Sequence, residues 1–428
     1  MDDLISILNK KIISPGEGEI YTVLKEGGLQ YLSENYIPKN ILYREEHIIN
    51  LGKMIKECLE FKTPATILLE GSPGTGKTMC FRIVEKVLQN GISSGLLRGK
   101  ICYVSGKGST VFKVANEILK SMGMREERSF GKAVSALKEA ASSMPIHVCI
   151  DDADLIKSYQ AGKYESYALP DLLYYFSRTP GLSATIITND FRFLEKINEE
   201  DARVYSSMTK EKSLIFERYG KKQCYDILGQ RVELAFKEGV FKEEALDKLA
   251  EYVSFVRDGD IRVGLEILRT CPYVAAQDKE EKIDENIIDK TIKHLEMDYL
   301  LRKIYSLPES QRGILAALYL KFREKGEEAF YSNELYDTYC DLLSSLKLPV
   351  ISLQSFRVKL NELTISGILE SIKSSRGKGK GIERKYKPTI PMYVLSTAAL
   401  RDPLFGSEVR RNIDRIVSDK ISRARGFQ

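Results

Sequence analysis

The chain has 428 residues and a formal net charge of +5, with 43% hydrophobic and 29% charged residues. This balance predicts a soluble, globular protein, and the length favours two or three domains over one. No segment approaches the roughly 18 uncharged apolar residues of a membrane span, so we expect no membrane partner. The N-terminus lacks the basic and apolar runs of a signal peptide.

The seven cysteines are scattered along the chain and form no C-x-x-C pair. Several lie inside apolar runs, as buried free thiols do. This distribution argues against a zinc site and indicates a reducing compartment such as the cytoplasm.

The first half of the chain alternates short apolar runs with longer segments of helical spacing. Residues 1–36 are predicted to form a polar, partly helical N-terminal extension. The predicted strands after it are Thr66–Glu70, Ile101–Val104, Ile146–Ile150, Ala184–Thr188 and Leu214–Phe216. The predicted helices between them cover 78–89, 111–122, 132–143 and 172–178. This alternation predicts an α/β fold with a parallel sheet and helices on both faces.

The second half begins with a helical pattern that contains no strand candidate. Helices are predicted over 225–237, 242–256, 261–269 and 285–296, which form a small all-helical domain. Three more helices, 311–324, 332–345 and 352–363, then precede a hairpin. The predicted domains are an extension (1–36), an α/β domain (37–217), a helical domain (218–299) and a C-terminal domain (300–428).

A glycine-rich segment, Gly71-Ser72-Pro73-Gly74-Thr75-Gly76-Lys77-Thr78, matches G-x-x-x-x-G-K-[ST] between a predicted strand and a predicted helix. Its glycines let backbone N–H groups surround phosphate oxygens at the positive end of the helix dipole. Lys77 is expected to reach the β- and γ-phosphates, and the Thr78 hydroxyl to ligate magnesium. A chance glycine-rich turn is the alternative, which the flanking strand and helix disfavour. The motif predicts that Ser72 to Met79 bind ATP with Mg²⁺, and ADP after hydrolysis.

Two aspartates, Asp151 and Asp152, follow the third predicted strand at its carboxyl end, where open α/β sheets bind ligands. Asp151 is predicted to hold the magnesium shell, and Asp152 to orient the attacking water. Asp152 is shorter than the Glu that many such ATPases carry, so its reach to that water is reduced. Two solvated acids at a strand end are the alternative. Asp154 is interpreted as a helix cap.

Two further polar residues are candidates for contact with the γ-phosphate. Asn189 ends the fourth predicted strand, where its amide could hold a water; a turn residue is the alternative. Arg262 follows Asp260, the predicted N-cap, in the first turn of a helix. An arginine there opposes the helix dipole, which favours another partner such as the γ-phosphate. An ordinary surface arginine is the alternative.

The last predicted helix and the hairpin after it are candidates for DNA contact. The apolar residues Leu353, Phe356, Leu360 and Leu363 recur at helical spacing and should face the core. The outward residues suit phosphates and base edges in a major groove: Gln354, Ser355, Arg357, Lys359 and Asn361. The hairpin is glycine-rich and basic, with Lys373, Arg376, Lys378, Lys380, Arg384, Lys385 and Lys387. This pattern predicts a winged helix that binds double-stranded DNA, with a solvated loop as the alternative for the wing.

Taken in order, these motifs resemble those of AAA+ ATPases, and more narrowly of the archaeal origin-recognition initiators related to eukaryotic Orc and Cdc proteins. The resemblance runs from about residue 35 to 390. Beside the phosphate loop and the acids, it rests on Tyr36-Ile37-Pro38, Tyr43-Arg44-Glu45-Glu46, the stretch 201–207, Phe216-Glu217-Arg218-Tyr219, Tyr225-Asp226-Ile227-Leu228, Gly259-Asp260-Ile261-Arg262 and Ser306-Leu307-Pro308.

The resemblance implies an AAA+ sheet domain with a helical lid and a C-terminal winged helix. It implies an adenine pocket at Ile37, Pro38 and Arg44, closed by Tyr219 and Ile227 of the lid. Asn189 and Arg262 would be the two sensors. The implied partners are a replication origin, other initiator copies and the replicative helicase, in the cytoplasm at the nucleoid.

This sequence departs from the family at two positions. Asp152 stands where the family usually has Glu, and Ser207 where many AAA+ proteins carry a trans-acting arginine, for which Arg203 is a weak substitute. Both departures favour a slow ATPase that uses ATP as a switch. A clamp-loader-like or other remodelling ATPase is the alternative, although the chain shows neither the Ser-Arg finger nor a zinc module. A signalling ATPase with a repeat sensor domain is a third possibility.

Overall fold

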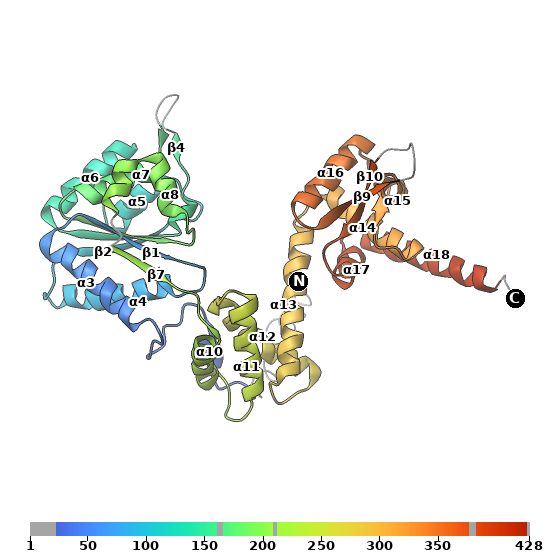
Figure 1. The fold of residues 1–428 in the computed structure, drawn as a ribbon, viewed down its shortest axis with the longest axis horizontal. Helices are drawn as coiled ribbons and strands as arrows, with labels where there is room; N and C mark the ends of the chain where they lie inside the picture. Colours follow the sequence, from blue (N-terminus) through green and yellow to red (C-terminus); the bar gives the residue numbers. More distant parts are fainter. Residues whose placement is uncertain (1–22, 161–165, 209–211, 376–381, 426–428) are drawn as a thin grey trace, which may run out of the picture. The chain divides into compact units, whose positions relative to one another are not determined.

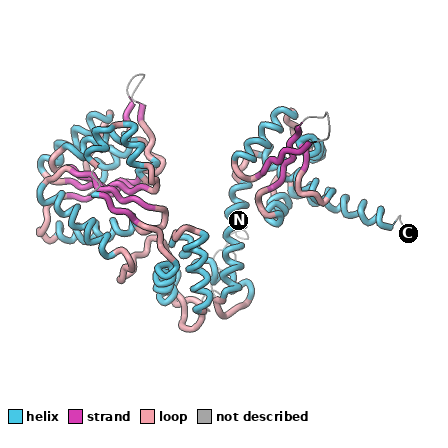
Figure 2. Tube along the Cα trace, in the orientation of Figure 1, coloured by secondary structure: helices cyan, strands magenta, loops and turns pink. Residues whose placement is uncertain are grey.

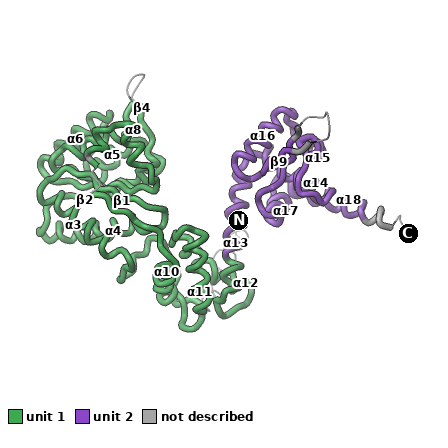
Figure 3. Tube along the Cα trace, viewed as in Figure 1, with its two compact units in different colours: residues 1–291 green, residues 292–428 purple. Residues whose placement is uncertain are grey.

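The computed structural model describes residues 23–160, 166–208, 212–375 and 382–425 (Figure 1). The chain divides into two compact units, residues 1–291 and 292–428 (Figure 3). The predicted boundary between the helical and C-terminal domains falls within a helix that begins in the first unit and ends in the second, α13 (Glu285–Tyr305).

The first unit is built on a parallel five-stranded sheet with the strand order β2-β3-β6-β1-β7. Its strands are β1 (Ala65–Gly71), β2 (Lys100–Ser105), β3 (Ile146–Asp151), β6 (Leu182–Thr188) and β7 (Ser213–Phe216). All five predicted strands are confirmed. β1, β3 and β6 are buried over almost their whole length, because helices cover both faces of the sheet, as is usual for parallel sheets.

Two layers of helices enclose this sheet, with an apolar core on each face (Figures 1 and 2). One face is covered by α3 (Glu45–Phe61) and α4 (Lys77–Ser93). The other is covered by α5 (Val111–Ser121), α6 (Phe130–Ser143), α7 (Leu169–Arg178), α8 (Phe193–Glu200) and α9 (Ala202–Ser207). A short turn, η2 (Ala153–Leu155), and a small hairpin of β4 (Tyr159–Gln160) and β5 (Ser166–Tyr167) follow β3.

A helical lid completes the first unit. It contains α10 (Lys221–Ala235), α11 (Glu243–Glu251), the π-helical turn η4 (Tyr252–Val256), α12 (Ile261–Asp278) and the start of α13. α12 continues past the predicted end at Arg269 although Pro272 lies inside it. Proline cannot donate to the carbonyl of Leu268, one turn earlier. The Cys271 thiol lies 3.5 Å from that oxygen and donates to it instead.

The N-terminal segment is fastened to the lid rather than extending away from it. Its short helix η1 (Gly28–Leu32) follows Lys25, whose backbone N–H donates to the Ala235 carbonyl of α10 over 2.9 Å. The Lys237 N–H donates to the Val23 carbonyl over 3.0 Å. Residues 23–36 therefore pack as part of the helical domain, although the sequence suggested a separate extension.

The second unit is a helical domain with a small antiparallel sheet of order β8-β10-β9. It contains the end of α13, then α14 (Glu309–Lys325), β8 (Phe330–Tyr331), α15 (Ser332–Ser345), α16 (Leu353–Ile365), β9 (Leu369–Ser375), β10 (Ile382–Pro388), α17 (Met392–Arg401) and α18 (Gly406–Arg425). The three predicted helices and the hairpin are confirmed. β8, α17 and α18 were not predicted, although Val394, Leu395 and Val409 belong to the core. Among the described helices, none combines the length and apolar character needed to cross a membrane.

One buried histidine joins two strands at the centre of the sheet. His147 of β3 lies opposite Ser183 of β6, and its ring nitrogens lie 2.8 Å from the hydroxyls of Ser183 and Thr185. Burial without a compensating charge lowers the pKa of His147 to about 3. The folded state therefore favours the neutral imidazole.

Because the pKa of His147 is lowered in the folded state, we expect the protein to lose stability at mildly acid pH. The folded pKa lies below the ordinary 6.5, so its stabilisation is complete above about pH 6.5 and is lost as the pH falls toward the folded value. Between about pH 6.5 and 5, the free energy of unfolding should fall by up to about 1.4 kcal/mol per pH unit from this group. Urea unfolding of wild type and His147→Asn measures the slope. His294→Asn is the control and should keep the pH dependence of wild type. If His147→Asn showed the same pH dependence of the free energy of unfolding as wild type, His147 would not be its source.

Candidate functional site

The glycine-rich loop runs from the end of β1 into α4. Gly74 and Gly76 have φ angles of 73° and 93°, in the left-handed region that glycine adopts without strain. A Cβ atom on Gly74 would lie 1.8 Å from a carboxylate oxygen of Asp260 at the start of α12. The loop therefore needs glycine both for its curvature and for its contact with the lid.

Lys77 is buried at the mouth of this loop. Its ammonium donates to the carbonyls of Gly71 over 2.7 Å and Ser72 over 2.8 Å, and to Asn189 Oδ1 over 2.9 Å. Desolvation lowers the pKa of Lys77 to about 8, against the opposing effect of Asp151. A negatively charged ligand would offset this desolvation, as expected of a phosphate-binding lysine.

Thr78 and Asp151 meet beside it at the carboxyl end of β3. The Thr78 hydroxyl donates to Asp151 Oδ2 over 2.8 Å, and the Tyr103 hydroxyl of β2 donates to the same oxygen over 2.7 Å. Burial and the neighbouring carboxylate raise the pKa of Tyr103, so it remains a donor. The hydroxyl and carboxylate are hard oxygen ligands of the kind that magnesium prefers.

Asp152, Asn189 and Asp154 form a second polar group next to this pair. Asn189 Nδ2 lies 3.4 Å from Asp152 Oδ1, and burial raises the pKa of Asp152, with Asp151 and Asp154 adding to the effect. Asp154 accepts from the Thr188 hydroxyl over 3.1 Å and from the Asn189 N–H over 3.2 Å. The interpretation of Asp154 as a helix cap is wrong, because its carboxylate holds the end of β6 and thus the position of Asn189.

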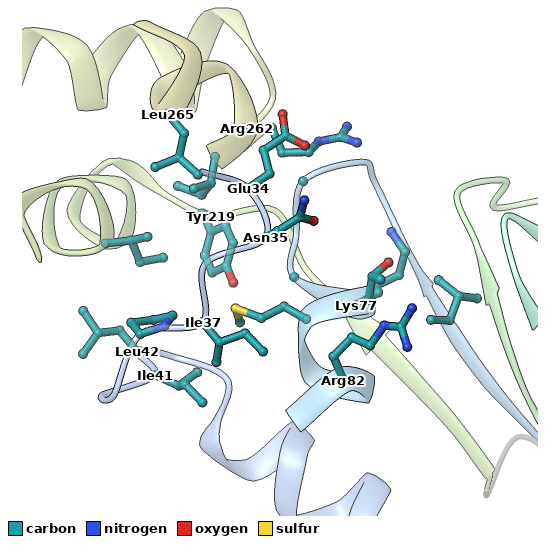
Figure 4. Close-up of a pocket in the computed structure, with 18 of the residues that line it drawn as sticks. Glu34, Asn35, Ile37, Ile41, Leu42, Lys77, Arg82, Tyr219, Arg262 and Leu265 are labelled. Carbon is teal, nitrogen blue, oxygen red and sulfur yellow. The ribbon is translucent and has the colours of Figure 1, made fainter. Parts of the chain in front are cut away.

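These groups open into a pocket of about 650 Å³ between the sheet domain and the lid. Figure 4 shows Ile37, Ile41 and Leu42 on one side and the cationic side chains of Lys77 and Arg82 on another. The predicted site residues that line the pocket are Ile37, Pro38, Gly74, Gly76, Lys77, Thr78, Met79, Asp151, Asp152, Asn189, Tyr219, Ile227 and Arg262. One end is apolar and the other carries the charged groups.

Several predicted nucleotide contacts lie outside this pocket: Arg44, Ser72, Pro73 and Thr75. Arg44 is buried behind the loop, where its guanidinium donates to the Thr75 carbonyl over 3.1 Å, the Glu217 carbonyl over 2.6 Å and the Tyr219 hydroxyl over 3.0 Å. Its position supports the loop from the far side. The side chain that the sequence suggested for adenine contact instead joins the sheet domain to the lid.

Other lining residues were missed by sequence reasoning: Glu34, Asn35, Ile41, Leu42, Arg82, Tyr103, Ile187, Gln230, Arg231, Ile261 and Leu265. Gln230 and Arg231 follow Ile227 by three and four positions on α10, a spacing that could have revealed them. Arg231 is buried and donates to the Tyr31 and Tyr36 carbonyls, over 3.0 Å each. It therefore holds the N-terminal segment over the pocket.

Arg262 lines the pocket but already has a partner. Asp260 caps α12 as predicted, accepting from the Arg262 N–H over 3.0 Å. Both Asp260 oxygens also accept from the Arg262 guanidinium, over 2.9 and 2.7 Å. This fork-like pairing fixes the arginine at the lid entrance.

In the second unit, α16 has the predicted division of faces. Phe356, Leu360 and Leu363 are fully buried, whereas Leu353 is only half-buried. The exposed residues are Gln354, Ser355, Arg357, Val358, Asn361 and Ile365. Lys359 is half-buried, and its ammonium lies 2.9 Å from both Glu362 oxygens. The exposed surface is therefore polar at Gln354, Ser355, Arg357 and Asn361 and apolar at Val358 and Ile365, with Lys359 turned toward a neighbouring acid.

The predicted wing is only partly within the described residues. Arg376, Lys378 and Lys380 lie outside them. Arg384 of β10 is exposed, and Lys385 lies 4.8 Å above the Tyr331 ring and 3.8 Å from Glu327. The arms of the hairpin thus present Arg384 to solvent while Lys385 packs against β8.

Comparison with known proteins identifies relatives over most of the chain. Residues 225–293 match the Cdc6 AAA+ ATPase-type lid domain, and residues 302–395 match the C-terminal winged-helix domain of Cdc6. An ORC1-type DNA replication protein 1 of Methanothermobacter thermautotrophicus is 26% identical over 388 residues, covering 88% of this chain and 95% of the relative. Its counterpart in Sulfurisphaera tokodaii is 27% identical over 82% of this chain and 86% of the relative.

Solved structures agree with this relationship. The Aeropyrum pernix ORC1 protein, solved in complex with DNA, matches with a TM-score of 0.67 and 27% identity over 90% of this chain and 98% of that chain. Cdc6p of Pyrobaculum aerophilum shares the fold, with a TM-score of 0.53 and 20% identity over 92% of this chain and 99% of that one. The predicted architecture of parallel sheet, helical lid and winged helix is confirmed.

Proposed function

We propose that this chain, whose lid and winged-helix domains match those of Cdc6, is an archaeal Orc1/Cdc6-type AAA+ replication initiator that binds ATP and recognises origin duplex DNA through its winged helix. The observation that carries the ATP proposal is the convergence of Lys77, Thr78, Asp151 and Asn189 on one pocket lined by both the sheet domain and the lid. A ligand there contacts both domains, so it can set their geometry.

The donor set fits a magnesium nucleotide. Thr78 and Asp151 supply a hydroxyl and a carboxylate 2.8 Å apart. Within the described residues, no group of three or more His, Cys, Asp or Glu side chains could hold a metal. The pair of Thr78 and Asp151 suits Mg²⁺, because this ion keeps several waters and takes the rest of its shell from substrate phosphates. When bound, the ion would neutralise charge on the phosphate oxygens.

The residues around the terminal phosphate favour slow turnover. Lys77 would exchange the loop carbonyls for phosphate oxygens, while Asn189 and Asp152 hold the attacking water. Asp152 is the shorter carboxylate, and Ser207 stands where many AAA+ proteins carry a trans-acting arginine. ATP would therefore act as a slow switch on lid position.

The exposed face of α16 supports DNA binding. Gln354, Arg357 and Asn361 project from one side of the helix, and these side-chain types contact base edges and phosphates in a major groove. The hairpin beside it carries Arg384 on an exposed strand position, suited to the phosphate backbone. Other initiator copies and the replicative helicase are the protein partners that this role would require.

The test is a genomic DNA footprint with and without ATP, on wild type and Lys77→Ala. Discrete protected sites that change with ATP in wild type alone are expected. The variant should bind ATP about 10- to 100-fold more weakly, as a charge-assisted contact is worth about 1.5–3 kcal/mol. Unchanged ATP affinity in Lys77→Ala would contradict the nucleotide site. Protection spread evenly over the genome would contradict a site-specific initiator.

A second prediction concerns the pairing of Arg262. Asp260→Asn keeps an oxygen that can cap α12 but removes the charge that holds the arginine. Because exposed ion pairs contribute up to about 1 kcal/mol, the preference for ATP over ADP should rise by up to about fivefold. Calorimetric titration with ATP and with ADP measures the two affinities and thus this preference. Asp201→Asn, which breaks a similar pair with Arg203 on α9, is the matched control. An unaltered preference in Asp260→Asn would argue against a phosphate partner for Arg262.

A third prediction concerns the winged helix. Replacing both Arg357 and Arg384 with Ala should weaken duplex binding and reduce the slope of log affinity against log salt by about 1 for each phosphate that is no longer neutralised. Fluorescence anisotropy over a salt series measures both. Lys53→Ala, which removes an exposed charge from α3 of the first unit, should leave the slope unchanged. A slope in the double variant equal to that of wild type would exclude this surface.

A further inference from the structure

Tyr103 makes a contact that no motif accounts for. β2 lies beside β3, with Tyr103 opposite Cys149 and Ser105 opposite Asp151. From there the Tyr103 hydroxyl donates to Asp151 Oδ2 over 2.7 Å, the oxygen that also accepts from Thr78. Asp151 Oδ1 accepts from the Asp152 N–H over 2.9 Å. Three donors from three segments thus fix both oxygens of this carboxylate.

Arg82 in turn holds the tyrosine ring. Its guanidinium carbon lies 3.4 Å from the Tyr103 ring centroid, and its Nη1 lies 2.9 Å from Glu85. Arg82 follows Thr78 by four positions on α4, so both residues occupy one face of that helix. Arg82 and Lys77 extend on the same side of the pocket (Figure 4). A continuous chain therefore runs from Glu85 through Arg82 and Tyr103 to Asp151.

We propose that Tyr103, held by Arg82, is a positioning residue that orients the Asp151 carboxylate toward the magnesium ion of a bound nucleotide. The inference rests on the proposed function of the pocket and adds to it a residue outside the phosphate loop and the strand-end acids. A hydrogen-bond partner of a metal-binding carboxylate fixes its rotation, and removal of such a partner typically lowers metal affinity about 10- to 100-fold.

The position of the Tyr103 hydroxyl favours a role in orienting Asp151 over a role in packing the sheet alone. A tyrosine that served only to pack the sheet would support nucleotide binding equally with and without magnesium. Tyr103 instead places its hydroxyl on the oxygen beside Thr78 and lines the pocket itself. Tyr103→Phe removes that hydroxyl and keeps the ring between Arg82 and the sheet, so the change is confined to one hydrogen bond.

The experiment measures the affinity of a fluorescent ATP derivative for the full chain, once with excess Mg²⁺ and once with EDTA. Tyr103→Phe should weaken binding about 10-fold in Mg²⁺ and leave binding in EDTA unchanged. Arg82→Met, which keeps an apolar stem over the ring, should give a smaller loss of affinity, also confined to Mg²⁺. Tyr205→Phe, on an exposed tyrosine of α9, is the matched control.

The outcomes distinguish the role of Tyr103 from the existence of the nucleotide site. Equal losses of affinity in Mg²⁺ and EDTA, or no loss in either, would overturn the role of Tyr103 while leaving the nucleotide site intact. Absence of binding by wild type in both conditions would instead reject the nucleotide site itself, and with it the inference. A Mg²⁺-specific loss of affinity in both Tyr103→Phe and Arg82→Met supports the chain of contacts.

Discussion

The buried ammonium of Lys77 is the constraint around which the first unit is organised. A charge removed from water needs oxygen partners, and the glycine-rich loop supplies the carbonyls of Gly71 and Ser72. Asn189 supplies a third oxygen from the end of β6, which fixes that end of the strand beside the loop. Asp154 then holds Asn189 from behind. The ends of β1 and β6 and the turn η2 are thus connected through the partners of one cation.

The sequence was sufficient to predict those parts of the structure that depend on local spacing. The strands were recognised because each is a short apolar run bounded by turns, as Ile146–Asp151 illustrates. The glycine-rich loop was recognised because its motif has a fixed order of glycines, lysine and hydroxyl, and Asp260 was identified as a cap from its place before α12. The division of α16 into buried and exposed faces followed from the helical period.

Contacts between distant segments could not be predicted in the same way. Nothing near Tyr103 in the sequence indicates that its hydroxyl reaches Asp151, because the contact depends on the pairing of β2 with β3. Arg44 illustrates the converse: the motif around it was found, but its side chain turns behind the loop instead of into the pocket. The α17 and α18 helices were not predicted, because the apolar residues that place them, such as Val394 and Val409, find their partners only in the folded core.

The position of Arg44 has a consequence for how the lid is joined to the sheet domain. The chain crosses between the lid and the sheet domain at Tyr43–Glu45, after the N-terminal segment, and at Phe216–Gly220, after β7. Arg44 lies in the first crossing and bonds Glu217 and Tyr219 in the second. Together with the Tyr43 hydroxyl, which donates to Asp226 of α10, and Arg218, whose Nε donates to Ser72 Oγ over 3.1 Å, Arg44 ties both crossings to the glycine-rich loop. The two connections between the sheet domain and the lid are therefore anchored directly behind the pocket.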